Sequence, residues 1–268
     1  MYTIVYFSPT GNVLHLAERL AGLLGVDESE ILPLEFTEPG NLKKNEQLVI
    51  LFPVHAFNAP RTVKRFVKQL PSNLYKGVNL IAVGSSVSWL NEAVSSDLKK
   101  VLLKKEYKII VDEIVAMPLT IIISFSDKLS HKLVAEAEEK IKDISVSIIE
   151  REKSVRKVKV KSHIANSLGK GESPAAKLFG RELHANSKCT SCGICWDNCP
   201  ERNIKQGSDG RPKFGSSCLM CMRCIYNCPE HAISPRFSKF IPIKKGYSFK
   251  ALMSSDEARD DARDEAGT

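Results

Sequence analysis

Cysteine is the residue type with the clearest chemical potential in this sequence. All eight cysteines of the 268-residue chain lie between Cys189 and Cys228, and the first 188 residues contain none. Thiols gathered this densely are typical of a disulfide framework or of a metal site. The residues Met1–Phe7 have neither a basic lead nor a small-residue cleavage site, so no secretion signal is expected. Metal ligation is therefore favoured over disulfides.

The cysteines form two copies of one pattern, C-x2-C-x2-C-x3-C-P, offset by 29 residues. The copies consist of Cys189, Cys192, Cys195, Cys199 and Pro200, and of Cys218, Cys221, Cys224, Cys228 and Pro229. Three thiolates at this spacing can wrap one corner of a cubane, whereas the fourth follows too soon to close the same cluster. Zinc sites normally use separated C-x2-C pairs. The spacing favours two [4Fe–4S] clusters over zinc.

This duplicated motif resembles the bacterial-type ferredoxin module, and all eight ligand positions match. In that pattern the fourth cysteine of each copy ligates the other cluster. The resemblance thus assigns to the first cluster Cys189, Cys192, Cys195 and Cys228, and to the second Cys218, Cys221, Cys224 and Cys199. A pair of clusters forms an electron conduit, whereas one would be enough to stabilise a fold, so electron transfer is favoured over a purely structural role. Trp196 and Tyr226 are expected in the core of this small α+β domain, residues 186–237.

A second candidate for chemistry is the loop Ser8-Pro9-Thr10-Gly11-Asn12-Val13, which follows the first apolar run. Two hydroxyl groups, a glycine and the free N–H groups of a helix start form an anion site. The loop is neither the dinucleotide fingerprint G-x-G-x-x-G nor a P-loop with its lysine. Because no Lys or Arg is near it in the sequence, the anion would be held by neutral dipoles. An ordinary turn and helix cap is the alternative.

The elements that would position these groups follow from hydrophobic periodicity. Apolar runs predict strands at Tyr2–Phe7, Gln47–Phe52, Val78–Gly84 and Lys108–Met117, with a weaker one near Glu30–Leu34. Helical periodicity predicts helices that begin near Val13, Pro60, Leu90 and Leu129, the first of which ends at Gly25. Strands alternating with helices predict an α/β domain over residues 1–150, a doubly wound five-stranded parallel sheet in the order 2-1-3-4-5.

In this strand order a ligand binds beyond the carboxyl ends of the first and third strands. The loops 53–60 and 84–89 should meet the loop 8–13 there, and the two later loops carry aromatic residues. This suits a planar ring with a phosphate tail, and the domain resembles the flavodoxins, whose fold is this sheet and whose cofactor is FMN. The resemblance implies that the FMN phosphate is bound by Ser8, Thr10, Gly11, Asn12 and Val13, and that the ring is flanked by Pro53, Val54, His55, Ala56, Phe57, Asn58, Gly84, Ser85, Ser86 and Trp89.

Two residues depart from the flavodoxin pattern. Flavodoxins commonly have a hydroxyl residue where Val13 stands, so one phosphate hydrogen bond would be lost. Related proteins often have glycine where this chain has Phe57-Asn58, although asparagine tolerates left-handed geometry well. His55 could transfer a proton to the cofactor or simply pack in its loop. Phe57 and Trp89 are candidates for stacking on the ring or for the core.

Residues 151–185 are expected to be a basic connector, because Arg151, Lys153, Arg156, Lys157, Lys159 and Lys161 precede a Gly/Ser/Pro-bearing stretch. It would be either a solvated linker or a docking surface for an acidic redox partner. Residues 238–268 form a C-terminal extension, and disorder is expected from about residue 254.

The combination of a flavodoxin-like domain and a two-cluster ferredoxin domain resembles the flavodoxin–ferredoxin fusion family. The resemblance implies an electron-transfer protein that links one-electron clusters to FMN. The alternatives are a flavin-dependent reductase of a small substrate, fed by its own ferredoxin domain, and a redox sensor that binds an acidic partner through the connector. Whether the chain is an enzyme stays open at this stage.

The formal net charge of +8 would attract an acidic partner at long range. Nucleic-acid binding is not expected, because no basic surface interleaved with aromatic residues is apparent. Membrane insertion is not expected, because no run of about 18 apolar residues occurs. A cytoplasmic location is the expectation, and the sequence leaves the oligomeric state open.

Overall fold

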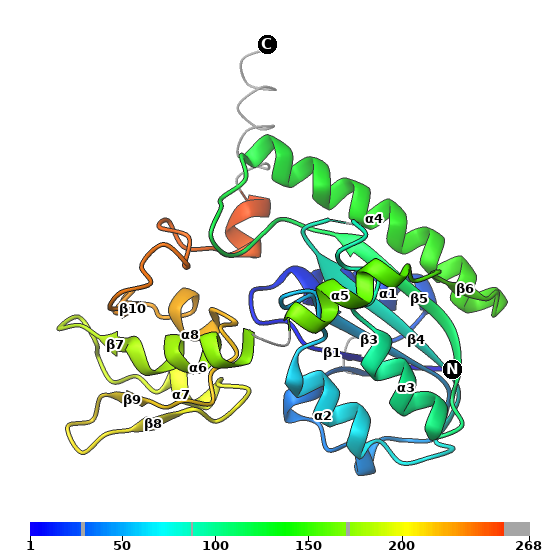
Figure 1. Cartoon of the computed structure of the whole chain (residues 1–268), viewed down its shortest axis with the longest axis horizontal. Coiled ribbons are helices and arrows are strands. Elements are labelled where there is room, and N and C mark those ends of the chain that lie inside the picture. The colour runs from blue at the N-terminus through cyan, green and yellow to red at the C-terminus, as the bar shows by residue number, and fades with distance from the viewer. Residues whose placement is uncertain (28–29, 87, 170–171, 255–268) are drawn as a thin grey trace.

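The computed structural model describes residues 1–27, 30–86, 88–169 and 172–254 (Figure 1). Its centre is a parallel sheet in the order β2-β1-β3-β4-β5-β6. The strands are β1 (Tyr2–Tyr6), β2 (Ile31–Pro33), β3 (Asn45–Pro53), β4 (Tyr75–Gly84), β5 (Lys108–Ala116) and β6 (Ser154–Val155). The first five strands confirm the predicted flavodoxin-like order, to which β6 adds a short edge strand.

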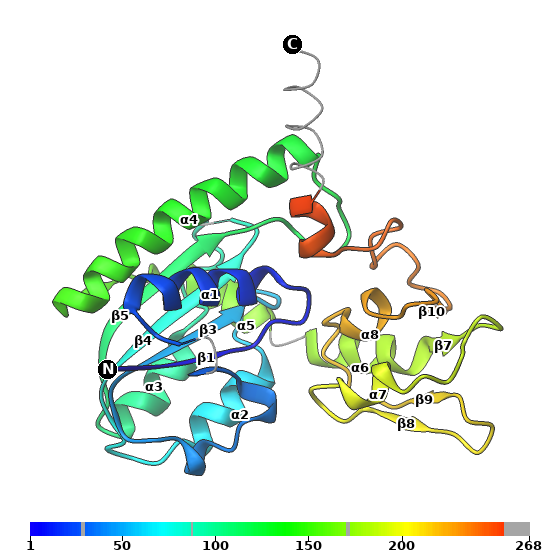
Figure 2. The same cartoon turned by 180° about the vertical axis from the view of Figure 1, so that it is seen from behind.

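Helices cover both faces of the sheet because the strands bury alternate residues on opposite sides. One face packs with α1 (Asn12–Leu24) and α4 (Asp127–Glu150) through Ile4 and Val49, and the other packs with α2 (Arg61–Gln69) and α3 (Ser96–Lys104) through Val5 and Ile50. Short 3₁₀ turns, η2 (Leu34–Phe36) and η3 (Pro39–Asn41), connect β2 to β3. Figures 1 and 2 show this layered arrangement from its two sides.

The ends of these helices follow ordinary capping chemistry. Gly25 ends α1 in the left-handed region (φ 65°), where its N–H reaches the last turn, as the sequence predicted. The Ser126 side chain accepts a hydrogen bond from the N–H of Leu129 and so caps α4. The predicted third helix begins later than its periodicity suggests, because the described residues between Gly84 and Ser96 form mostly turns.

The connector differs from the expected free linker. It contains β6, α5 (Val160–Gly169), α6 (Glu172–Glu182) and β7 (Leu183–Ala185). The Arg156 guanidinium binds the fully buried Asp112 carboxylate at 2.9 Å and the Glu92 carbonyl oxygen at 3.0 Å. Lys99 reaches the same carboxylate at 2.5 Å. A buried carboxylate needs such partners, so this part of the basic segment serves the fold instead of facing solvent.

The cysteine-rich module begins at β7 rather than at residue 186, because β7 pairs antiparallel with β10 (Ile233–Pro235). A second antiparallel pair joins β8 (Ile204–Gln206) to β9 (Pro212–Phe214), and two short helices, α7 (Ile194–Asp197) and α8 (Arg223–Tyr226), complete the module. Its small core consists of Phe179, Leu183, Met222, Ile225 and Ile233. Tyr226 packs against this core, as predicted.

The C-terminal extension returns to the α/β domain. Residues 249–254 are helical, and Phe249 is buried in the cluster that holds α1 and α4. The predicted disorder falls on residues 255–268, which lie outside the described residues. Within the described part of the chain, no helix has the length and apolar character needed to cross a membrane.

Candidate functional site

The loop after β1 exposes backbone donors at the start of α1. Gly11 precedes the helix with φ 103° and no side-chain cap, while the Leu14 N–H donates to the Ser8 hydroxyl at 3.0 Å. Among the described residues, no acceptor is found for the backbone N–H groups of Asn12 and Val13. Two unpaired N–H groups at the positive end of a helix dipole are able to bind an anion, and the anion site that the sequence predicts for this loop stays a prediction.

The Asn12 side chain is not free to take part in anion binding. Its amide donates to the Pro118 carbonyl oxygen at 2.9 Å, and its carbonyl oxygen accepts the Tyr247 hydroxyl at 2.5 Å. Burial raises the pKa of Tyr247, so this hydroxyl stays protonated and able to donate. Asn12 can therefore offer an anion only its backbone N–H. The side chain instead ties the loop to the C-terminal extension.

A cavity opens beside this loop at the carboxyl edge of the sheet. It is lined by loop residues from four strand ends, β1, β3, β4 and β5, and by two residues of the cysteine module. The lining comprises Pro9, Thr10, Asn12, Val13, Pro53, Val54, His55, Ala56, Val83, Gly84, Ser85, Met117, Pro118, Leu119, Thr120, Ile121, Met220 and Cys221. Polar side chains of the lining include Thr10, His55 and Ser85, and the 117–121 wall is mostly apolar. This arrangement suits a flat apolar ring with an anionic tail.

Most of the predicted ring-flanking residues line this cavity, but four do not. Phe57, Asn58, Ser86 and Trp89 lie outside its lining. Trp89 is 40% exposed, and the Lys161 ammonium lies 4.9 Å from its ring centre. Phe57 and Trp89 are therefore not part of the cavity lining, and ring stacking by either residue stays a prediction. The sequence reasoning missed the wall 117–121, although the rule that selects carboxyl-end loops would have included the loop after β5.

The loop after β3 forms a tight turn. His55 and Asn58 exchange backbone hydrogen bonds of 2.9 and 2.8 Å, and the two residues between them have positive φ, 41° at Ala56 and 64° at Phe57. Residues other than glycine adopt positive φ values at a cost in free energy. Contacts from outside the loop are therefore needed to stabilise this turn. Asn166 of α5 does this, because its amide donates to the Phe57 carbonyl oxygen and to Asn58 Oδ1, at 3.0 and 2.9 Å.

His55 is desolvated between the sheet and the cavity. Burial lowers its pKa to about 4. The imidazole is therefore neutral at pH 7, and it can offer one N–H donor and one acceptor to a bound group. It does not bring a permanent positive charge to the cavity.

The cysteine module repeats its backbone as well as its sequence. Positive φ values recur 29 residues apart, at Ser191 and Met220, at Gly193 and Met222, and at Arg202 and His231. The helices α7 and α8 have the same offset. The thiols of Cys199 and Cys228 each accept a backbone N–H at 3.3 Å from the residue four positions later. N–H···S bonds of this kind hold and tune cluster ligands.

Several of the cysteines lie close enough to one another to interact electrostatically. Burial raises the pKa of Cys221 to about 12, and the nearby thiols of Cys218 and Cys199 add to this shift. Burial likewise raises the pKa of Cys195 to about 11, with Cys189 and Cys192 as its thiol neighbours. All eight cysteines are free thiols. In the described residues, no group of three or more His, Cys, Asp or Glu side chains is arranged to hold a single metal ion.

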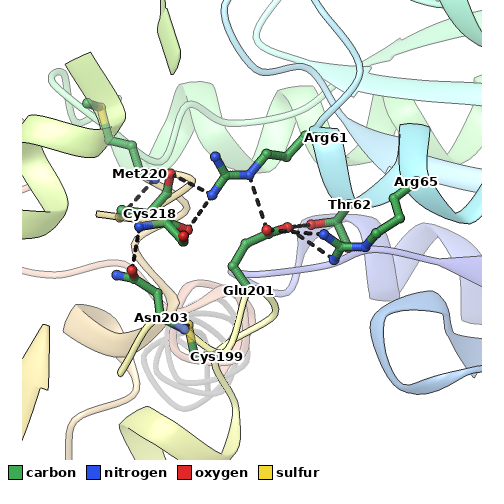
Figure 3. A network of polar contacts seen from close by, with 9 residues as sticks. Arg61, Thr62, Arg65, Cys199, Glu201, Asn203, Cys218 and Met220 are labelled. Atoms are coloured by element: carbon green, nitrogen blue, oxygen red, sulfur yellow. Dashed lines mark hydrogen bonds and ion pairs between the residues drawn. The ribbon is translucent and has the colours of Figure 1, made fainter. Parts of the chain in front are cut away.

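A polar network joins the second cysteine motif to α2 (Figure 3). Arg61 donates to the carbonyl oxygens of Ser217 and Cys218 and lies 3.1 Å from the Glu201 carboxylate. Thr62 and Arg65 bind the same carboxylate, at 2.5 and 3.2 Å, and the Glu201 side chain is only 7% exposed. The loop that carries Cys218 is thereby fixed to the α/β domain.

Arg223 forms a second link between the two parts of the chain. It lies between Cys221 and Cys224 in the sequence and is buried. Its guanidinium donates to the Ser8 carbonyl oxygen at 2.9 Å, to the Asn198 carbonyl oxygen at 3.2 Å, and to the carboxylate of Glu35. The expectation that no cation lies near the phosphate loop is therefore wrong in three dimensions. The Glu35 side chain, 1% exposed, balances this charge.

Comparison with known proteins bears on the α/β part of the chain. No family model matches, and no curated protein matches. Among solved structures, the chain is similar to an FMN-bound Fusobacterium nucleatum flavodoxin mutant (15% identity, TM-score 0.39, covering 57% of this chain and 96% of that one). It is also similar to a flavodoxin from the domain Archaea (13%, 0.37, 55% and 97%) and to an NADH:FMN oxidoreductase in its apo form (16%, 0.39, 55% and 88%). The flavodoxin-like α/β fold of the N-terminal half follows from its own strand order.

Gly11 gives a direct test of the loop geometry. Gly11→Ala should destabilise the fold by about 1–3 kcal/mol, because φ is 103° and the new Cβ would lie 2.7 Å from the Phe249 Cβ. Gly22→Ala on the same helix is the matched control, since Gly22 has no atom within 4 Å of the added carbon. It should stabilise the fold by about 0.5–1 kcal/mol. Urea unfolding of both variants measures this contrast, and equal effects would contradict the loop geometry.

Proposed function

We propose that the chain is an electron-transfer protein that binds FMN in the cavity and two [4Fe–4S] clusters in the cysteine module. The observation that supports this most strongly is the composition of the cavity wall. The lining includes both residues of the predicted anion-binding loop and Cys221, a predicted ligand of the second cluster. A flavin in the cavity and a cluster on Cys221 would then be neighbours. Both would lie at the boundary between the α/β domain and the cysteine module, which we call the seam and which Arg61, Glu201 and Arg223 hold together.

The residues at the cavity fit FMN, and the eight thiols fit two [4Fe–4S] clusters. The backbone N–H groups of Asn12 and Val13 and the Thr10 hydroxyl would hold the phosphate, and the apolar walls around Val54 and Leu119 would flank the ring. The eight thiols, repeated with their N–H···S bonds, fit two four-cysteine sites. When bound, FMN supplies one- and two-electron chemistry, and the clusters supply one-electron chemistry.

The residues of the chain would hold and orient these groups. Arg61 and Arg223 keep the second cysteine motif against the α/β domain, so the separation of the cofactors is set by the fold. Met220 and Cys221 close one side of the cavity, which leaves less room for a substrate than an open reductase pocket would. This favours an electron carrier over the alternative, a flavin-dependent reductase of a small substrate.

Anaerobic purification with metal, sulfide and flavin analysis tests the proposal. About eight irons, about eight sulfides and about one FMN per chain are expected. Zinc in place of iron, or disulfide bonds among the cysteines, would overturn the cluster assignment. Iron without flavin would overturn the assignment of the cavity.

The phosphate site predicts a preference for FMN over riboflavin. Apoprotein stripped of flavin should bind FMN at least about 100-fold more tightly, because riboflavin leaves the Asn12 and Val13 N–H groups unpaired. Thr10→Val should weaken FMN binding by about 10-fold and leave riboflavin binding unchanged. Thr37→Val, whose hydroxyl donates to the Pro33 carbonyl oxygen away from the cavity, is the matched control. Fluorescence titration measures the affinity of each of the three proteins for each flavin, and equal affinity of the wild type for the two flavins would contradict the anion site.

A further inference from the structure

The helix α5 leaves aliphatic side chains in solvent. Its buried side, which includes Ser162, Ala165 and Asn166, packs against the α/β domain. On the other side Val160 is 84% exposed, Ile164 61% and Leu168 74%. These residues recur every four positions, so they lie along one side of the helix. Scattered exposed apolar residues are normal, but a continuous row marks an interaction surface.

The next helix also exposes one aliphatic side chain. Leu178 of α6 is 69% exposed, while Ala176 and Phe179 beside it are buried. Both helices lie on the side of the molecule that faces the viewer in Figure 1 and that is turned away in Figure 2. We call Val160, Ile164, Leu168 and Leu178 the aliphatic stripe. It belongs to neither the core clusters nor the lining of the cavity between the two parts of the chain.

The positive charge of the chain is concentrated around this stripe. Residues 151–185 contain nine basic and three acidic residues, a net charge of +6 against +8 for the whole chain. Lys157, Lys161 and Lys177 are exposed. The fold uses Arg156 for the buried Asp112, and Lys159 pairs with Glu92 at 3.7 Å. Lys157 and Lys177 are exposed and can face an anionic surface, and Lys161 lies over the exposed Trp89 ring.

We propose that the aliphatic stripe and its lysines dock this protein on an anionic membrane surface. Aliphatic side chains on one side of a helix, flanked by lysines, are the composition of helices that lie in the membrane interface. Lysine stems can cover apolar surface while their ammonium groups reach the lipid phosphates. Protein–protein hot spots instead are enriched in Trp, Tyr and Arg, and Leu and Val are under-represented there. This docking is shallow and differs from insertion across the bilayer.

Vesicle sedimentation of the anaerobically prepared full chain tests this inference. The protein should pellet with vesicles of phosphatidylcholine plus phosphatidylglycerol and stay in solution with phosphatidylcholine alone. Ile164→Gln/Leu168→Gln should weaken binding at least about 10-fold, and so should salt raised to about 0.5 M. Ile149→Gln is the matched control: Ile149 is 52% exposed on α4, on the other face of the sheet, and its replacement should leave binding unchanged.

Four outcomes would overturn the inference. The wild-type chain could fail to pellet with anionic vesicles, or the stripe variant could bind them as well as the wild type. Light scattering could instead show a dimer that the stripe variant loses, or the stripe could be needed only for binding an acidic redox protein. Circular dichroism and thermal unfolding establish that each variant is folded. Because flavin and iron contents are measured on the same samples, failure of membrane binding is separable from failure of the proposed function.

Discussion

Serine substitutions at two cysteines should remove either half or all of the iron, depending on which pair is changed. If each cluster takes its fourth ligand from the other motif, Cys192→Ser/Cys228→Ser damages one cluster and leaves about four irons per chain. Cys192→Ser/Cys199→Ser then damages both clusters and leaves almost none. A sequential arrangement, with each motif closing its own cluster, predicts the reverse, because Cys192 and Cys199 belong to one motif.

One contact across the two motifs motivates this prediction. Cys199 is among the thiols whose charge acts on Cys218, Cys221 and Cys224, although it belongs to the first motif. Iron analysis and low-temperature spectra of the reduced proteins measure the result. Ser187→Ala, next to the first motif and exposed, is a control that should keep about eight irons. Equal iron loss in the two double variants would contradict both arrangements.

Removing the Arg223 guanidinium should produce the largest loss of stability among single substitutions at the seam. Arg223→Gln leaves the Glu35 carboxylate, 1% exposed, without its cationic partner. Breaking a buried ion pair from one side typically costs about 3–5 kcal/mol. The same change also removes donors from the carbonyl oxygens of Ser8 and Asn198. We therefore expect the seam to loosen and the phosphate loop to lose one of its supports.

A double-mutant cycle separates charge from packing. Arg223→Gln/Glu35→Gln should recover more than half of the loss, because no uncompensated charge remains. Arg65→Gln is the matched control: Arg65 also bonds across the seam, but it is 50% exposed, and Arg61 still pairs with Glu201. Its cost should stay below about 1 kcal/mol. Urea unfolding at constant pH is measured on the wild type, Arg223→Gln, Glu35→Gln, the double variant and the Arg65→Gln control. An Arg223→Gln loss as small as that of Arg65→Gln would show that the seam does not depend on this pair.

Local patterns in the sequence were enough to predict the main helices and strands. Short apolar runs indicated the strands, and Gly25 indicated the end of α1, because both signals act within a few residues. The 29-residue sequence repeat is matched by equivalent backbone turns at Ser191 and Met220. The ligand quartets and the FMN assignment stay predictions until cofactors are measured.

Burial and distant partners limited what the sequence could predict. The Asn12 side chain accepts a hydrogen bond from Tyr247, which lies 235 residues away in the sequence. Arg223 donates to the Ser8 carbonyl oxygen, 215 residues away. Arg156 resembles its solvated neighbours in the basic segment, yet it pairs with Asp112 inside the fold. Periodicity describes which side of an element is apolar, but it carries no information on which distant groups meet there. The spacing of the cysteines is a property of the sequence alone, whereas the position of Cys221 beside the phosphate loop results from packing two modules together through buried charges.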